Sequence, residues 1–182
     1  MSNNLAENLF IITAPSGAGK TTLIKNVIEF AKKNDEKVFM SVSDTTRIPR
    51  SNELDGTDYL FISEEEFKVN IDDQIYIEHA RVHGNLYGTP KQPIEQHLKS
   101  GFKVLLEIDW QGAMEILKTY PEAQSIFICP PSIEELHKRL HDRGLDSAEV
   151  IAERIHGAKL EMEKSSEFKY QIINNSLETA FK

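Results

Sequence analysis

One combination of features constrains this chain most strongly, namely an apolar run, a glycine-bearing loop and a helical pattern in direct succession. The apolar run is Leu9–Thr13, bounded by a turn signal, and it predicts a buried strand. The loop reads Ala14-Pro15-Ser16-Gly17-Ala18-Gly19-Lys20-Thr21, and apolar residues then recur at helical spacing as far as about Lys33. A strand, a loop of this composition and a helix, in that order, predict a phosphate-binding loop.

The chemistry of such a loop is specific to phosphate groups. Glycines let backbone N–H groups point toward phosphate oxygens, and the helix N-terminus adds partial positive charge. We expect Lys20 to reach the β- and γ-phosphates and the Thr21 hydroxyl to bind Mg²⁺. Ala14 departs from the usual pattern, which has glycine there, and the alternative is a glycine-rich turn that contains Gly-Lys-Thr by chance. The predicted ATP-binding residues here are Ala14, Pro15, Ser16, Gly17, Ala18, Gly19, Lys20, Thr21 and Thr22.

The rest of the chain alternates between strand and helix patterns, which predicts an α/β fold with a parallel sheet. Further strands are expected at residues 38–42, 59–62, 75–78, 104–109, 125–129 and 171–173. Further helices are expected after Ser63, at 91–98 and 113–117, after Ser132, at 147–165 and from 178 onward. Residues 83–88 read as a turn or loop. The short strands and single short helix between residues 43 and 92 indicate an inserted lobe.

Composition excludes some classes of function. The 182 residues fit a single domain, and their net charge of −8 argues against a nucleic-acid groove, which needs a basic face. No apolar run approaches the twenty residues of a membrane span. The first seven residues lack the pattern of a secretion signal, and the lone Cys129 cannot form an internal disulfide. These features predict a reducing compartment, and therefore a cytoplasmic protein without a nucleic-acid or membrane partner.

Arginine is scarce in this sequence and is clustered where it occurs. Arg47 and Arg50 lie in a stretch rich in hydroxyl groups, and a second group follows at Arg139, Arg143 and Arg154. The planar guanidinium fork suits phosphate oxygens, so both clusters are candidate phosphate contacts. Scattered surface charge is the alternative interpretation, and we accept it for Arg81.

Several motifs, in order along nearly the whole chain, resemble the guanylate kinase family. They are Ser43-x-Thr45-Thr46-Arg47-x-Pro49-Arg50, Gly56-x-Asp58-Tyr59-x-Phe61, Tyr87-Gly88-Thr89 and Leu106-Glu107-Ile108-Asp109-Trp110-Gln111-Gly112. The resemblance implies a P-loop nucleoside kinase fold and phosphoryl transfer from ATP to GMP or dGMP. It also implies a core at about 1–42, 93–138 and 155–182, a GMP-binding lobe at about 43–92 and a lid at about 139–154.

The resemblance also assigns roles to individual residues. Glu78 matches the position that reads guanine, because a carboxylate accepts hydrogen bonds from both N1–H and the N2 amino group, a donor pair that adenine lacks. The implied GMP-binding residues are Ser43, Arg47, Arg50, Tyr59, Glu78, Tyr87, Thr89, Glu107 and Asp109. Either Glu107 or Asp109 is expected near Mg²⁺ through water, and Asn174 on the adenine side. The implied catalytic residues are Lys20, Arg50, Arg143 and Arg154.

Several alternatives stay open from the residues alone. Without the resemblance, Glu78 is interpreted as an ordinary strand residue and the tyrosines as residues at the edge of the core. The alternative functions are a kinase of another monophosphate, a peptide-binding module of the same fold, and a GTPase. The intact Gly19-Lys20-Thr21 argues against the binding module, and the missing Asn-Lys-x-Asp run argues against a GTPase. His137 and His141 have the spacing of zinc ligands, but surface positions explain them better. The sequence leaves monomer and homo-oligomer undecided.

Overall fold

The computed structural model describes residues 5–51, 53–82, 84–142, 144 and 147–181. The chain divides into two compact units. The first, here the lobe unit, comprises Met1–Phe10, Val38–Leu106 and Gln111–Ala123. The second, here the loop unit, comprises Ile11–Lys37, Glu107–Trp110 and Gln124–Lys182.

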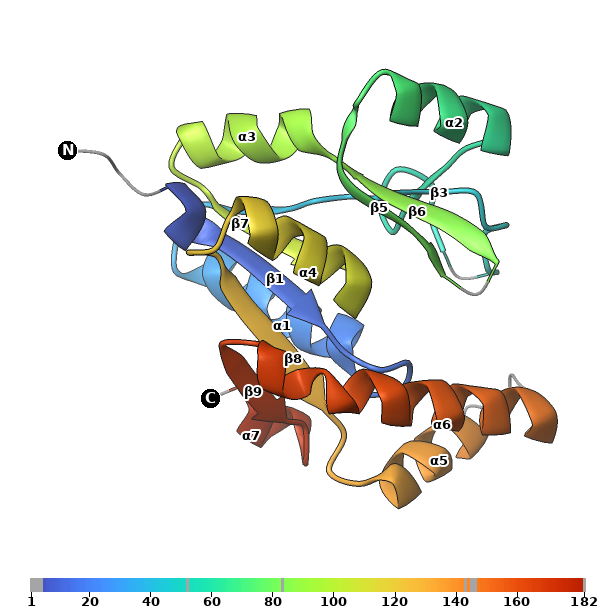
Figure 1. Ribbon diagram of the computed structural model, residues 1–182. Helices are drawn as coiled ribbons and strands as arrows, with labels where there is room; N and C mark the ends of the chain where they lie inside the picture. Colours follow the sequence, from blue (N-terminus) through green and yellow to red (C-terminus); the bar gives the residue numbers. More distant parts are fainter. Residues whose placement is uncertain (1–4, 52, 83, 143, 145–146, 182) are drawn as a thin grey trace. The chain divides into compact units, whose positions relative to one another are not determined.

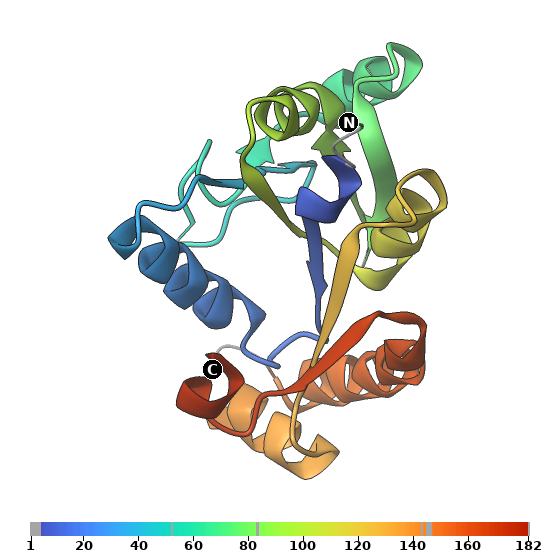
Figure 2. The same ribbon diagram turned by 90° about the vertical axis from the view of Figure 1, so that its left-hand side faces the viewer.

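The loop unit carries the predicted phosphate loop, which joins the end of β1 to the start of α1, drawn in blue in Figure 2. β8 and β9 pair in parallel within this unit, with Ile126 opposite Tyr170. The elements of this unit are β1 (Leu9–Thr13, its first two residues in the lobe unit), α1 (Lys20–Lys33), β8 (Gln124–Cys129), α5 (Ile133–Asp142), α6 (Ala148–Glu163), η2 (Ser165–Glu167), β9 (Tyr170–Ile173) and α7 (Leu177–Phe181).

Helices α5 and α6 lie side by side and share a small apolar core (Figure 1). Each begins at a serine whose hydroxyl accepts a hydrogen bond from a backbone N–H of the first turn. Ser132 accepts from Glu135 at 3.1 Å, and Ser147 accepts from Val150 at 3.4 Å. These bonds satisfy donors that a helix leaves free at its start, so both helices begin where the sequence predicted.

The lobe unit contains parts of two sheets. β2 and β7 pair in parallel, with Val38 opposite Lys103. The elements of this unit are η1 (Leu5–Asn8), β2 (Val38–Met40), β3 (Asp44–Thr45), β4 (Leu60–Phe61), α2 (Glu64–Asp72), β5 (Tyr76–Val82), β6 (Asn85–Pro90), α3 (Lys91–Lys99), β7 (Lys103–Glu107) and α4 (Trp110–Thr119). The last residue of β7 and the first of α4 belong to the loop unit.

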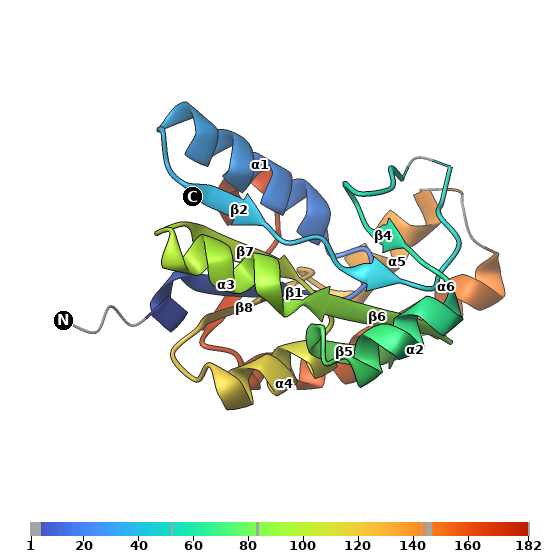
Figure 3. The same ribbon diagram turned by 90° about the horizontal axis from the view of Figure 1, so that it is seen from above.

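The described strands form two sheets. The larger has the strand order β2-β7-β1-β8-β9, and the smaller has the order β4-β3-β6-β5. In the smaller sheet β5 and β6 are antiparallel neighbours, and Figure 3 shows α2 next to this pair. Phe67 of α2 packs there against Tyr76 and Leu86. The α/β class predicted from the sequence is confirmed.

The prediction of a turn or loop at residues 83–88 was wrong for residues 85–88. Gly84 has φ +83° and makes the turn, but Asn85 already belongs to β6. β6 pairs with β5 and also with β3, a two-residue strand for which the sequence analysis predicted no strand. Non-local backbone pairing therefore overrides the local turn signals here. His83 lies outside the described residues.

Other expected elements differ from the structure only at their ends. The strand expected at 38–42 ends at Met40, and α4 begins at Trp110 instead of residue 113. Within the described ranges, no helix combines the length and the apolar character that crossing a membrane requires.

Candidate functional site

The loop between β1 and α1 has the backbone shape that its glycines permit. Gly17 and Gly19 both have φ +92°, a left-handed conformation that other residues adopt only with strain. Space is also limited, because a Cβ at Gly17 would lie 2.9 Å from Leu136 Cδ1. A Cβ at Gly19 would collide with Asn174 Nδ2. Both glycines are therefore required by conformation and by packing.

Lys20 and Thr21 open α1 beside a carboxylate. The Thr21 hydroxyl donates to Glu107 Oε1 at 2.8 Å, and Lys20 Nζ lies 3.8 Å from the same oxygen. Lys20 Nζ also donates to the Ile108 carbonyl oxygen at 3.5 Å. The structure thus gathers a cation, a hydroxyl and a carboxylate at the N-terminus of a helix, where anionic groups are favoured.

Asn174 lies on the other side of the loop and is buried, with 2 % of its surface exposed. Its Nδ2 donates to the Ala18 carbonyl oxygen at 2.7 Å, which explains why no side chain fits at Gly19. Arg139 joins this region, because Nη2 donates to the Asn174 carbonyl oxygen at 3.1 Å while Nε pairs with Glu135. A pocket of about 460 Å³ is lined by Gly17, Gly19, Thr22, Arg139, Asp142, Asn174 and Leu177.

Glu161 of α6 is a carboxyl group in the surroundings of Lys20. Burial raises its pKa to about 7, the positive charge of Lys20 opposes that rise, and the negative charge of Asp109 adds to it. Trp110 follows Asp109 in the sequence, and Lys164 Nζ lies 5.7 Å from the centroid of its ring in a cation–π contact. Nothing in the sequence marks Glu161, because its position depends on how α6 packs.

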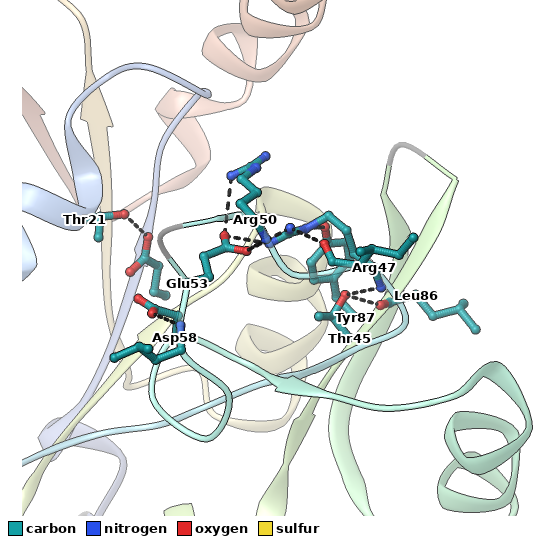
Figure 4. A network of polar contacts seen from close by, with 11 residues as sticks. Thr21, Thr45, Arg47, Arg50, Glu53, Asp58, Leu86 and Tyr87 are labelled. Carbon is teal, nitrogen blue, oxygen red and sulfur yellow. Dashed lines mark hydrogen bonds and ion pairs between the residues drawn. The ribbon is translucent and has the colours of Figure 1, made fainter. Parts of the chain in front are cut away.

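A second group of residues lies in the lobe unit around Arg47 (Figure 4). The two terminal nitrogens of Arg47 donate to the two carboxylate oxygens of Glu53 at 2.9 and 2.8 Å. Arg47 Nε donates to the Tyr87 hydroxyl at 3.2 Å, and the guanidinium carbon lies 5.4 Å from the centre of the Tyr59 ring. Arg47, Tyr59 and Tyr87, which the sequence predicted to act together, therefore share one cluster.

Glu53 organises this cluster. Its carboxylate accepts from the Arg50 backbone N–H at 2.8 Å and lies 3.6 Å from Arg50 Nη1. Burial alone would raise the pKa of Glu53, but the hydrogen bonds from Arg47 and from the Arg50 backbone lower it. The same bond with Glu53 is the main cause that raises the pKa of Arg47 above its usual value. The Arg50 side chain remains 61 % exposed, so its fork faces solvent.

The predicted base-reading residues also lie together. Glu78 of β5 is 5 % exposed, and Thr89 of β6 is its neighbour across the strand pair. The Thr89 hydroxyl donates to Glu78 Oε1, and Thr89 Oγ1 lies 3.0 Å from the buried Ser43 Oγ. A chain of two hydroxyls thus ends on a buried carboxylate.

Behind this chain lies a further buried polar group. Asp44, adjacent to Ser43, accepts from the Tyr76 hydroxyl at 2.7 Å and from Asn70 Nδ2 at 3.4 Å. Burial raises the pKa of the Asp44 carboxyl, and the Tyr76 hydrogen bond opposes that rise. These contacts join β3 to β5 and α2.

The predicted site residues thus fall into two groups, one in each unit. Lys20, Thr21, Glu107 and Asn174 surround the phosphate loop, whereas Arg47, Arg50 and Glu78 belong to the lobe unit. Arg154 is half-buried on α6, and Arg143 lies outside the described residues. The sequence interpretation assigned no role to Glu53, Gly112 or Glu161.

Comparison with known proteins identifies relatives of the whole chain. The family model for guanylate kinase matches residues 6–182. A guanylate kinase of Dechloromonas aromatica is 48% identical over 176 residues, which cover 97% of this chain and 85% of the relative. A guanylate kinase of Idiomarina loihiensis is 50% identical over 168 residues, covering 92% and 79% of the two chains.

A solved structure agrees with these matches. The crystal structure of guanylate kinase from Anaplasma phagocytophilum has a TM-score of 0.74 and 34% identity to this chain. The superposition covers 94% of this chain and 79% of that one. Sequence and fold comparisons therefore point to the same family.

Proposed function

This chain belongs to the guanylate kinase family, and we propose that it transfers the γ-phosphoryl group of ATP to GMP, giving ADP and GDP. We include dGMP as an acceptor, because no contact proposed below involves the ribose 2′-hydroxyl. The observation that carries the proposal is the buried Glu78 carboxylate, held by Thr89 and Ser43, in the same unit as the Arg47 cluster. This unit offers a base-reading group together with a phosphate-binding group.

The loop unit is the proposed donor site. Backbone N–H groups of Ser16, Gly17 and Gly19 and the α1 N-terminus would enclose the ATP phosphates, with Lys20 on the β- and γ-oxygens. Thr21 and Glu107 fit Mg²⁺, because a hydroxyl and a carboxylate oxygen 2.8 Å apart are the hard ligands that this ion prefers. Bound there with ATP, Mg²⁺ would offset phosphate charge. The pocket beside Asn174 would receive the adenine.

The lobe unit is the proposed acceptor site. Arg47, Arg50, Tyr59 and Tyr87 would hold the GMP phosphate, since two guanidinium groups and two phenols suit a dianion that must be fixed in line. Glu78 would accept from guanine N1–H and N2, with Ser43 and Thr89 beside the base. A carboxylate facing adenine would meet no such donor pair, which gives a physical basis for selectivity.

The remaining assignments rest on the family pattern. Residues 43–92 form the proposed GMP-binding lobe, and residues 139–154 form the proposed lid within a core made of the rest of the chain. Arg143 and Arg154 would bring positive charge to the phosphoryl group during transfer, where the protein acts mainly by positioning and charge stabilisation. Asp109 is assigned to the acceptor side or to a water on Mg²⁺. We place the enzyme in the cytoplasm.

A monophosphate panel tests the proposed reaction. ATP and Mg²⁺ are supplied with GMP, AMP, UMP or CMP in turn, and ADP formation is measured. We expect strong preference for GMP. Equal use of AMP would contradict the guanine assignment, and no turnover with any monophosphate would favour the binding-module alternative.

Lys20→Ala tests the donor site. The variant should lose GMP-dependent ADP formation almost completely, because it lacks the ammonium group that is proposed to contact the β- and γ-phosphates. Lys25→Ala is the matched control, since Lys25 is an exposed lysine of the same helix. Circular dichroism should report a folded protein in both cases. Retained turnover in Lys20→Ala would refute the donor-site assignment.

A further inference from the structure

The motif Trp110-Gln111-Gly112 opens α4, and the reaction described above leaves its glycine without a role. Gly112 is the third residue of α4 and is buried. Glycine is the least favourable residue in a helix interior apart from proline, because it loses the most backbone freedom on folding. Local structure therefore gives no reason for glycine at this position.

The surroundings of Gly112 supply the reason. A Cβ built on Gly112 would lie 2.9 Å from Glu78 Cδ and closer still to Glu78 Oε2. Real Cβ atoms essentially never approach another heavy atom so closely. The Glu78 carboxylate therefore lies directly against the backbone of the first turn of α4, in the space that any side chain at residue 112 would occupy.

A second contact holds the carboxylate in this place. On its other side, Oε1 accepts the hydrogen bond from Thr89, which in turn contacts Ser43. The helix is also held, because Ala113 and Ile116 are completely buried.

We propose that Gly112 is a positioning residue for acceptor selectivity. Its missing Cβ leaves the space in which the Glu78 carboxylate lies, between the first turn of α4 and Thr89, in position to read the base. A side chain at residue 112 displaces the carboxylate, because the far end of a glutamate moves more easily than a buried helix. The inference rests on the proposed function, since it acts through Glu78.

Gly112→Ala is the test, with Gly157→Ala as its matched control. Both glycines lie inside helices, but a Cβ at Gly157 would meet no heavy atom within 4 Å. Gly112→Ala should raise the KM for GMP by about ten- to a hundredfold, the scale of a lost charged hydrogen bond, and leave the KM for ATP within about twofold. Gly157→Ala should leave both values unchanged. An unchanged KM for GMP in Gly112→Ala would overturn the proposal.

A double-mutant cycle with Glu78→Ala separates the loss of this contact from any general effect of Gly112→Ala on helix α4. Once the carboxylate is gone, adding Gly112→Ala should change the KM for GMP by less than about twofold. The same fold-change in both backgrounds would overturn the proposal. A normal GMP to AMP preference in Glu78→Ala alone would instead contradict the proposed role of Glu78.

The same set of variants tests the proposal if Gly112→Ala alone does not fold. Glu78→Ala and Glu78→Ala/Gly112→Ala are then compared by thermal unfolding. An unfolding temperature of the double variant equal to or above that of Glu78→Ala supports the contact, because alanine fits the helix once the carboxylate is absent. Failure of the double variant to fold overturns the proposal.

Discussion

Arg47 is oriented by contacts with other groups of the protein. Glu53 engages both of its terminal nitrogens, Tyr87 accepts from Nε, and Tyr59 lies beside its guanidinium plane. A guanidinium that is already oriented loses less conformational freedom when a phosphate binds. In the proposed acceptor site, Glu53 would therefore contribute to GMP binding by orienting Arg47, although it carries the same sign of charge as the ligand.

Glu53→Gln tests this orienting role. The amide cannot accept hydrogen bonds from both Arg47 nitrogens, so the guanidinium should lose its fixed direction. We expect the KM for GMP to rise by about three- to tenfold, because a charge-assisted pair is replaced by a weaker one, while the KM for ATP stays unchanged. Steady-state kinetics with each substrate varied in turn measures both values.

Glu65→Gln is the matched control for this experiment, because Glu65 is an exposed glutamate on α2 of the same unit. A lower KM for GMP in Glu53→Gln would contradict the orienting role. It would show that the Glu53 carboxylate competes with the phosphate for Arg47.

At the scale of elements, the small sheet depends on buried polar contacts as well as on its apolar core. Asp44 on β3 is 4 % exposed and receives hydrogen bonds from Tyr76 on β5 and Asn70 on α2. A buried carboxylate without such bonds is costly. The contacts therefore fix β3, and with it the neighbouring Ser43, relative to β5, which carries Glu78.

Tyr76→Phe should destabilise the protein through this contact. The ring still packs against Phe67, but Asp44 loses its shorter hydrogen bond. We expect a loss of about 1–3 kcal/mol in the free energy of unfolding, measured by urea denaturation. Tyr170→Phe, at an exposed tyrosine, should change it by less than about 0.5 kcal/mol. Equal stability of Tyr76→Phe and wild type would show that Asp44 finds another partner.

Local patterns predicted the elements whose causes are local. The strand Leu9–Thr13, the loop and α1 follow from hydrophobic spacing and glycine chemistry, and Ser63 marks the start of α2 by its bond from Glu66. β3 and β6 could not be predicted in this way. Their pairing joins Thr45 to Tyr87, 42 positions later, so no local window contains the signal.

The candidate site shows the same division between local and non-local causes. The phosphate loop could be recognised from its own residues, whereas Glu78 was assigned only through the family resemblance. Glu53 and Glu161 could not be assigned from the sequence. The position of Glu53 depends on the path of an irregular segment, and the position of Glu161 depends on the packing of α6 near Lys20.

At the scale of the whole molecule, the net charge of −8 coexists with sites proposed for two anionic ligands. The cations are local, with Lys20 at the phosphate loop and Arg47 and Arg50 in the lobe unit, and each has a carboxylate partner within the protein. At the proposed sites, ligand binding would therefore replace or join ion pairs that the protein already contains.

The stability of the ligand-free protein should depend on pH through Glu161. Its pKa is raised from its usual value of about 4.5 to about 7, so between these pH values the folded state holds a proton that the unfolded state has released. Stability should therefore fall as pH rises from about 4.5 to about 7, by about 3 kcal/mol in total from this group.

Glu161→Gln isolates this contribution. The amide mimics the protonated carboxyl and does not titrate, so the variant should lose part of the decline seen in wild type over this pH range. Thermal unfolding temperatures measured in steps of pH give the comparison, and Glu163→Gln at an exposed site of α6 is the control. Parallel pH profiles for wild type and Glu161→Gln would contradict the raised pKa.

We propose that Glu78 makes phosphoryl transfer by this protein selective for guanine. The measurement that tests it most directly is the ratio of kcat/KM for GMP to that for AMP, in wild type and in Glu78→Gln. Wild type should strongly prefer GMP. The variant should lose about ten- to a hundredfold of that ratio, because the amide cannot accept both guanine hydrogen bonds. A ratio unchanged by the substitution would contradict the claim.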